Sequence, residues 1–130
     1  MELLEAYFKE IKDRQSQDLS AKPIENGELV RELIGEIRSL NSVHKKIALD
    51  LLIYNVLPGT TSAAHQKAVF LQDVIYREYT VKEINVDFAF ELLSHMRGGP
   101  SITVLLNIAL SEDQHLARKA VEVLKRQVFL

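Results

Sequence analysis

The sequence contains no cysteine among its 130 residues. This absence excludes disulfide bonds, thiol catalysis, cysteine-ligated zinc and iron–sulfur ligation by this chain. Tryptophan is also absent, and there are only 5 glycines and 3 prolines, so few residues interrupt regular secondary structure. Neither sign of charge dominates, because 16 Lys and Arg face 18 Asp and Glu, for a net charge of −2. The overall field therefore does not favour binding to nucleic acid or to an anionic membrane.

Long apolar runs are also missing. The longest stretch, residues 47–57, is interrupted by Asp50 and Asn55 and is too short to span a bilayer. Glu2 and Glu5 stand where a signal peptide would carry basic residues. We expect a cytoplasmic protein without a membrane partner.

The residues that are present have the composition of a globular protein. Hydrophobic residues make up 47% of the chain and charged residues 26%. The length corresponds to one domain of ordinary size, roughly 100–150 residues. We therefore expect residues 1–130 to form a single domain.

Apolar residues recur every three or four positions along the chain, which is typical of amphipathic helices. Helix starts are predicted by six polar residues that precede apolar stripes: Asn26, Ser42, Thr61, Asn85, Ser101 and Ser111. The β-branched segment 79–84 has no partner strand, so we interpret it as a connection. The sequence predicts an all-α fold of about seven helices, either an α-solenoid or an irregular bundle.

The third predicted helix, Val43–Leu57, is apolar on almost every side, and we expect it to be covered on several faces. Asp50 inside it has two interpretations. It could serve as a ligand or interface group, or it could be a structural acid that pairs with Lys46 or with a helix end. We favour the structural interpretation, because buried acids normally have partners.

The chain breaks most sharply at Arg97-Gly98-Gly99-Pro100. Glycine at a helix end often supplies a left-handed residue, and proline cannot continue the helix. We expect Gly98 or Gly99 to have a positive φ and to set the angle between the fifth and sixth helices. We place residues 97–100 in a candidate interface.

Catalytic signatures are lacking. There is no glycine-rich phosphate loop and no H-E-x-x-H pattern, and we assign no catalytic, cofactor-binding or metal-binding residue. Glu91 and His95 share a helix face at i, i+4 and could contribute two metal ligands of a metal-dependent enzyme. The favoured interpretation is a solvated helix pair.

Four basic residues, Arg118, Lys119, Lys125 and Arg126, gather on the last predicted helix. They form a candidate basic patch that could bind phosphate or RNA. No aromatic platform accompanies them, so a solvated face is the favoured interpretation.

The chain closes on three apolar residues, Val128, Phe129 and Leu130. Free termini are usually frayed and polar, so we add these residues to the candidate interface. We expect part of this triplet to pack near Leu106 and Leu110 and the remainder to form a docking surface.

Several stretches taken together resemble a known family. The most specific are the Pro-Gly, Ala-Ala and Phe-Leu elements between residues 57 and 71 and the Glu-Leu-Leu to Gly-Gly stretch at residues 91–99. Residues 22–24, 48–52 and 127–130 add to the likeness. The set resembles the N-terminal HEAT-like helical domain of the bacterial aconitase B (aconitate hydratase B) family.

The resemblance implies an interaction domain of a larger hydro-lyase. The family's enzyme interconverts citrate and isocitrate through cis-aconitate on a [4Fe–4S] cluster that later domains hold. The implied partners are those downstream domains, a second copy in a homodimer, or another metabolic enzyme. The alternative is a stand-alone regulatory module that binds RNA or another partner.

Overall fold

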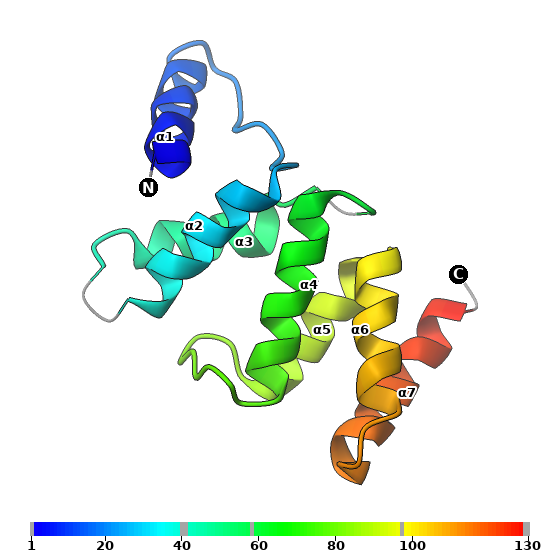
Figure 1. The fold of residues 1–130 in the computed structure, drawn as a ribbon. Helices are drawn as coiled ribbons and strands as arrows, with labels where there is room; N and C mark the ends of the chain where they lie inside the picture. Colours follow the sequence, from blue (N-terminus) through cyan, green and yellow to red (C-terminus); the bar gives the residue numbers. More distant parts are fainter. Residues whose placement is uncertain (1, 40–41, 58, 97, 129–130) are drawn as a thin grey trace.

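A computed structural model describes residues 2–39, 42–57, 59–96 and 98–128, and these ranges fold into seven helices (Figure 1). In chain order the helices are α1 (Glu2–Gln15), α2 (Gly27–Arg38), α3 (Lys45–Tyr54), α4 (Ser62–Ile75), α5 (Val86–Met96), α6 (Gly99–Ala109) and α7 (Gln114–Val128). The described residues contain no strand, only two isolated bridges, Ile24 with Val56 and Val81 with Ile84. The predicted all-α fold is confirmed.

Helix α4 lies at the centre of the molecule. It packs against α2 on one side and against α5 and α6 on the other (Figure 1). Ala63, Ala64 and Ala68 are completely buried along it. Small side chains let neighbouring helix backbones approach closely, so these alanines account for the number of helices that α4 can contact.

Helix α1 lies on the outside and is tied to the rest of the chain at the end of α3. Leu4 and Tyr7 are its buried residues. The Tyr7 hydroxyl donates to the Lys22 carbonyl at 2.6 Å, and the Asn55 amide donates to the same carbonyl at 2.9 Å. The backbone N–H of Ile24 in turn donates to the Asn55 carbonyl at 2.7 Å. The linker between α1 and α2 is therefore held against the end of α3.

Three of the six predicted helix starts are confirmed. The side chains of Asn26, Thr61 and Asn85 each accept a hydrogen bond from a backbone N–H of the turn that follows. These bonds satisfy donors that the first turn of a helix would otherwise leave unpaired.

The other three predicted starts are wrong. α3 begins at Lys45, three residues after Ser42. Gly98 precedes α6, and Ser101 lies in the first turn of that helix. Ser111 is displaced by Asp113, which directly precedes α7 and accepts the backbone N–H of Leu116 at 3.1 Å. A carboxylate at this position also interacts favourably with the positive end of the helix dipole.

The expectation that the third helix is covered on several faces is wrong. Ile47 is 41% exposed and Tyr54 is 80% exposed, and Asp50 between them is also exposed. Residues at i, i+3 and i+7 share one helix face, so these three form a solvent-facing stripe. Asp50 is not a buried acid, and in the described structure it forms no ion pair with Lys46.

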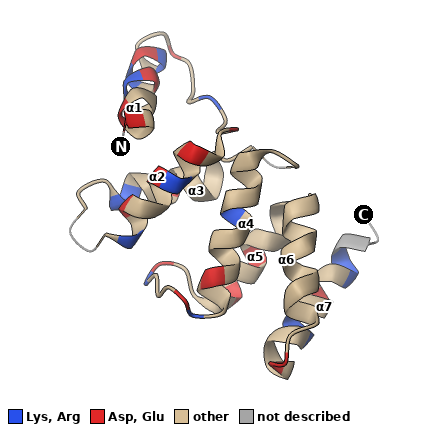
Figure 2. Ribbon diagram, viewed as in Figure 1, with Lys and Arg blue, Asp and Glu red and all other residues tan. Residues whose placement is uncertain are grey.

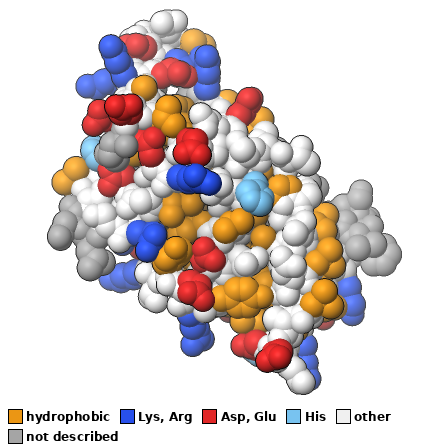
Figure 3. Space-filling view, viewed as in Figure 1, with side chains coloured by type: hydrophobic (Ala, Val, Ile, Leu, Met, Phe, Trp, Pro, Cys, Tyr) orange, Lys and Arg blue, Asp and Glu red, His pale blue; other side chains and the backbone are white. Residues whose placement is uncertain are grey.

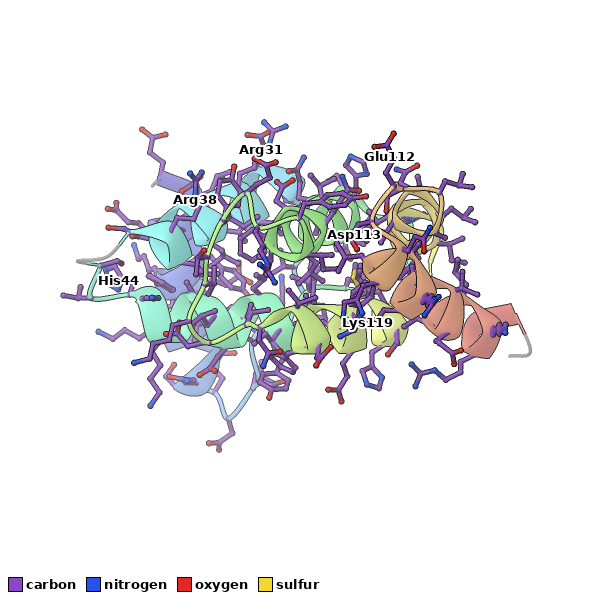
Figure 4. All side chains as sticks on the ribbon, turned by 90° about the horizontal axis from the view of Figure 1, so that it is seen from below. Arg31, Arg38, His44, Glu112, Asp113 and Lys119 are labelled. Atoms are coloured by element: carbon purple, nitrogen blue, oxygen red, sulfur yellow. The ribbon has the colours of Figure 1, made fainter. Side chains whose placement is uncertain are left out.

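The segment between α4 and α5 is a connection, as the sequence predicts, and it folds back over α2. The Arg38 guanidinium lies 3.8 Å from the centre of the Tyr79 ring, an arrangement that allows a cation–π interaction. Figure 4 shows Arg38 and Arg31 on the same side of the molecule, both from α2. This contact holds the connection against the α2 surface.

Candidate interaction surfaces

The glycine turn before α6 differs from its predicted geometry. Gly98 has φ −145° and ψ 171°, an extended conformation open to any residue, and Gly99 is already the first residue of the helix. The predicted positive φ at Gly98 or Gly99 is wrong. The glycine with a positive φ is Gly59, at 105°, in the loop before α4.

Gly98 is required for a different reason, which is close packing against another loop. A Cβ atom at this position would lie 2.3 Å from the Gly59 carbonyl oxygen and 2.8 Å from its carbon. Ser101 supports the turn, because its hydroxyl donates to the Gly98 carbonyl at 3.0 Å. Gly98 and Pro100 are both half-buried, whereas Gly99 is exposed. Arg97 lies outside the described residues.

An apolar stripe is exposed along α6. Ile102 is 37% exposed, Leu106 48% and Leu110 85%. Their spacing of four residues places them on one side of the helix. Figure 3 shows hydrophobic side chains gathered over the position of α6. We call Ile102, Leu106 and Leu110 the α6 stripe.

Leu110, at the C-terminal end of the α6 stripe, is the most exposed of its three residues. α7 begins near the C-terminal end of α6 and runs back in the opposite direction (Figure 1). The prediction that the C-terminal triplet packs near Leu106 and Leu110 concerns side chains that lie outside the described residues, so it stays a prediction. Val128 is the last residue of α7, and Phe129 and Leu130 lie outside the described residues.

Figure 2 marks Lys and Arg residues near the start and near the end of α7. The hollows that these residues line divide the predicted basic patch between two sides of the helix. Arg118 and Lys125 flank Val121, which is 38% exposed, in a hollow of about 400 Å³. Lys119 and Arg126 line a different cleft of about 510 Å³, between α5 and α7. Successive helix positions are 100° apart, so sequence neighbours such as Arg118 and Lys119 face different directions.

Lys119 also pairs with an acidic side chain. Its ammonium forms an ion pair with Asp87 on α5, and Figure 4 marks the position of Lys119 on α7. The hydrogen bond from Lys119 and its positive charge lower the pKa of Asp87. Part of the basic charge of α7 is thus used to hold α5 and α7 together.

Glu91 and His95, the pair that could have bound a metal, are both exposed in the cleft between α5 and α7. Across the described ranges, no group of three His, Asp or Glu side chains is arranged to hold a metal ion. The chain has no cysteine. Iron–sulfur clusters are held by cysteine thiolates, so the residues of this chain do not fit the cluster that the family resemblance implies.

Lys67 on α4 is a site that the sequence reasoning missed. Its side chain is 6% exposed, and its ammonium donates to the Ile53 carbonyl near the end of α3 at 3.1 Å. Burial lowers the pKa of Lys67 to about 8. The sequence could have indicated that Lys67 is buried, because it lies three residues after Ala64 and four before Leu71, on the buried face of α4.

The comparisons with known proteins agree on one relationship. Residues 6–130 match the model of the aconitate B N-terminal domain family. Aconitate hydratase B of Pseudomonas aeruginosa is 34% identical over 128 residues, which are 98% of this chain and 14% of that protein. The corresponding proteins of Salmonella typhimurium and Escherichia coli are 30% and 28% identical over the same length, again 98% of this chain and 14% of each protein.

The chain thus spans about one seventh of the length of these curated relatives, and it matches their N-terminal part. None of the helices in the described ranges has the length and hydropathy that a bilayer-crossing segment needs.

Proposed function

The chain belongs to the aconitate hydratase B family as its N-terminal domain, and from this premise we propose that it is a non-catalytic assembly domain whose α6 stripe packs against downstream domains of such an enzyme. The enzyme interconverts citrate and isocitrate through cis-aconitate in the cytoplasm, on a cluster held by the downstream domains. This chain contributes a HEAT-like surface, and residues 1–130 act as one domain.

The observation that carries the proposal is the exposure of the α6 stripe. Leu106 and Leu110 are large apolar side chains that are 48% and 85% exposed to solvent. Contiguous apolar surface of this kind favours association, because burying it releases about 25 cal/mol per Å². The curated relatives continue for most of their length beyond the matched segment, which supplies a covalently linked partner for this face.

The sharpest test is reconstitution in trans. Aconitate hydratase B of Pseudomonas aeruginosa, produced without its matched N-terminal segment, is mixed with this chain and analysed by size-exclusion chromatography with light scattering. We expect a complex with the parent chain and at least a tenfold weaker one with the double variant Leu106→Ser, Leu110→Ser. Both positions are exposed, so these changes should leave folding nearly unaltered.

A matched control is Val43→Ser, which replaces an apolar residue that is 89% exposed before α3. This variant should bind like the parent. If the double variant also bound like the parent, the α6 stripe would not be the assembly surface. If no complex formed but the parent self-associated through the stripe, the partner would be a second copy of the chain.

The alternative of RNA binding has less support. Arg118 and Lys125 face one side of α7, Lys119 and Arg126 face another, and Asp87 is paired with Lys119. A continuous cationic surface would be needed to follow a phosphate backbone. We therefore favour the assembly role.

A further inference from the structure

A small cavity of about 290 Å³ opens beside the buried Lys67. Its floor is formed by side chains that are buried, Lys67, Leu92 and Met96, while Tyr54 and His95 at its edge are exposed. The remaining lining residues are Ile53 and Val56, both half-buried. The cavity is thus an apolar recess with one cation at its base and a polar rim.

Among the residues that the structure describes, the Lys67 ammonium has no acidic partner. An ammonium group carries three N–H donors, and the Lys67 ammonium uses one of them for the Ile53 carbonyl. No Asp or Glu is among the residues that line the cavity. A buried cation without a counter-ion is costly, so an anion that entered the recess would gain both charge compensation and hydrogen bonds.

We propose that this cavity binds a small monocarboxylate with an apolar body, its carboxylate on the Lys67 ammonium and its body against Leu92 and Met96. The size fits such a ligand, since the volume lies at the lower limit of small-molecule sites, roughly 300–1,000 Å³. The proposal does not depend on the assembly role argued above, because every lining residue belongs to this chain.

The surroundings favour one negative charge over two. A phosphate or a tricarboxylate needs several cations or a helix N-terminus to replace its hydration. The described residues that line this recess include a single lysine. The recess lies at the C-terminal end of α3, where the helix dipole is negative. A carboxylate on a hydrocarbon body matches one cation among apolar side chains.

Benzoate and benzamide form a matched pair of probes, because they have the same shape and differ in charge. The methyl resonances of Met96 and Ile53 report occupancy in NMR titrations of the full chain at pH 7. We expect benzoate to shift both resonances in a saturable manner and to bind at least tenfold more tightly than benzamide. Equal affinities for the two probes would overturn the proposal, and this comparison needs no variant.

Variants supply a second, independent measurement. Lys67→Met should weaken benzoate binding at least tenfold, whereas Lys46→Met, at an exposed lysine of α3, should leave it unchanged. Retained benzoate affinity in folded Lys67→Met would also overturn the proposal.

The pH dependence identifies the group responsible. Tyr54 and His95 are the other titratable groups that line the cavity. Above a pKa of about 8 the ammonium of Lys67 loses its proton, so benzoate affinity should fall about tenfold per pH unit. A His95→Gln variant should keep that fall. An affinity independent of pH between 7 and 9.5 would contradict the assignment to Lys67.

Discussion

Replacing Gly98 with alanine should destabilise the protein, although its backbone angles suit any residue. The added Cβ would lie 2.3 Å from the Gly59 carbonyl oxygen, well inside van der Waals contact. The three Gly59 atoms nearest to this Cβ all belong to the backbone, so no flexible side chain can move aside. The overlap must therefore separate the turn before α6 from the loop before α4.

The size of the effect follows from the cost of forcing an extra atom between two closely packed backbone segments, which we take as about 1–3 kcal/mol, the cost of overpacking. For a domain of this length, each kcal/mol lowers the melting temperature by about 4 °C. We expect Gly98→Ala to melt about 4–12 °C below the parent.

Gly35 provides the matched control. It lies in the middle of α2, and a Cβ atom added there would meet nothing within 4 Å. Alanine is the better helix former by about 1 kcal/mol, so Gly35→Ala should melt above the parent.

The assay is thermal and urea denaturation followed by circular dichroism at 222 nm. Melting of Gly98→Ala within 1 °C of the parent would refute the packing argument, and the turn would then tolerate a side chain. Gly59→Ala tests the other mechanism, because the strain there comes from a positive φ of 105° and not from contacts.

Two further predictions concern polar side chains. Burial lowers the pKa of Lys67 from an ordinary 10.5 to about 8 in the folded state, so between these pH values the unfolded chain binds more protons than the folded chain. The free energy of unfolding should therefore rise from pH 8 to 9.5, and urea titrations of Lys67→Met should lack that rise. Asn55→Ala removes the amide that donates to Tyr7 and to the Lys22 carbonyl and should cost about 1–3 kcal/mol. Asn107 is exposed, so Asn107→Ala should change the free energy of unfolding by less than about 0.5 kcal/mol in the same denaturation experiment. Similar losses for Asn55→Ala and Asn107→Ala would disprove the role of Asn55 in holding the linker against the end of α3.

The helices were predictable because their signals are local. Apolar periodicity and the caps at Asn26, Thr61 and Asn85 depend on residues within one helical turn. The start of α7 was missed because Asp113, which lies closer to the helix than Ser111, accepts the backbone N–H of its first turn. Local patterns thus identify a helix more reliably than its first residue.

Features that depend on tertiary contacts were not predictable in the same way. A positive φ was expected at Gly98 or Gly99, but the requirement at Gly98 comes from a contact with Gly59 of another loop, which has no local signature. The basic residues of α7 were grouped by sequence proximity, although Arg118 and Lys119 face different clefts. The spacing of Lys67 from Ala64 and Leu71 places it on the buried face of α4, but the recess beside it is formed by residues of α3 and α5 that no local pattern brings together.

The central position of α4 also has a consequence for biosynthesis. Helices α1 to α3 emerge from the ribosome first. The surface of α2 that packs on α4 stays uncovered until residues 62–75 have been made. Those that emerge later, α5 and α6, pack on a helix that is already present. Because chains fold from the N-terminus during synthesis, the first stable core can close only once α4 has left the exit tunnel. A pause in translation just before that point would prolong the exposure of the α2 surface, and one just after it would not.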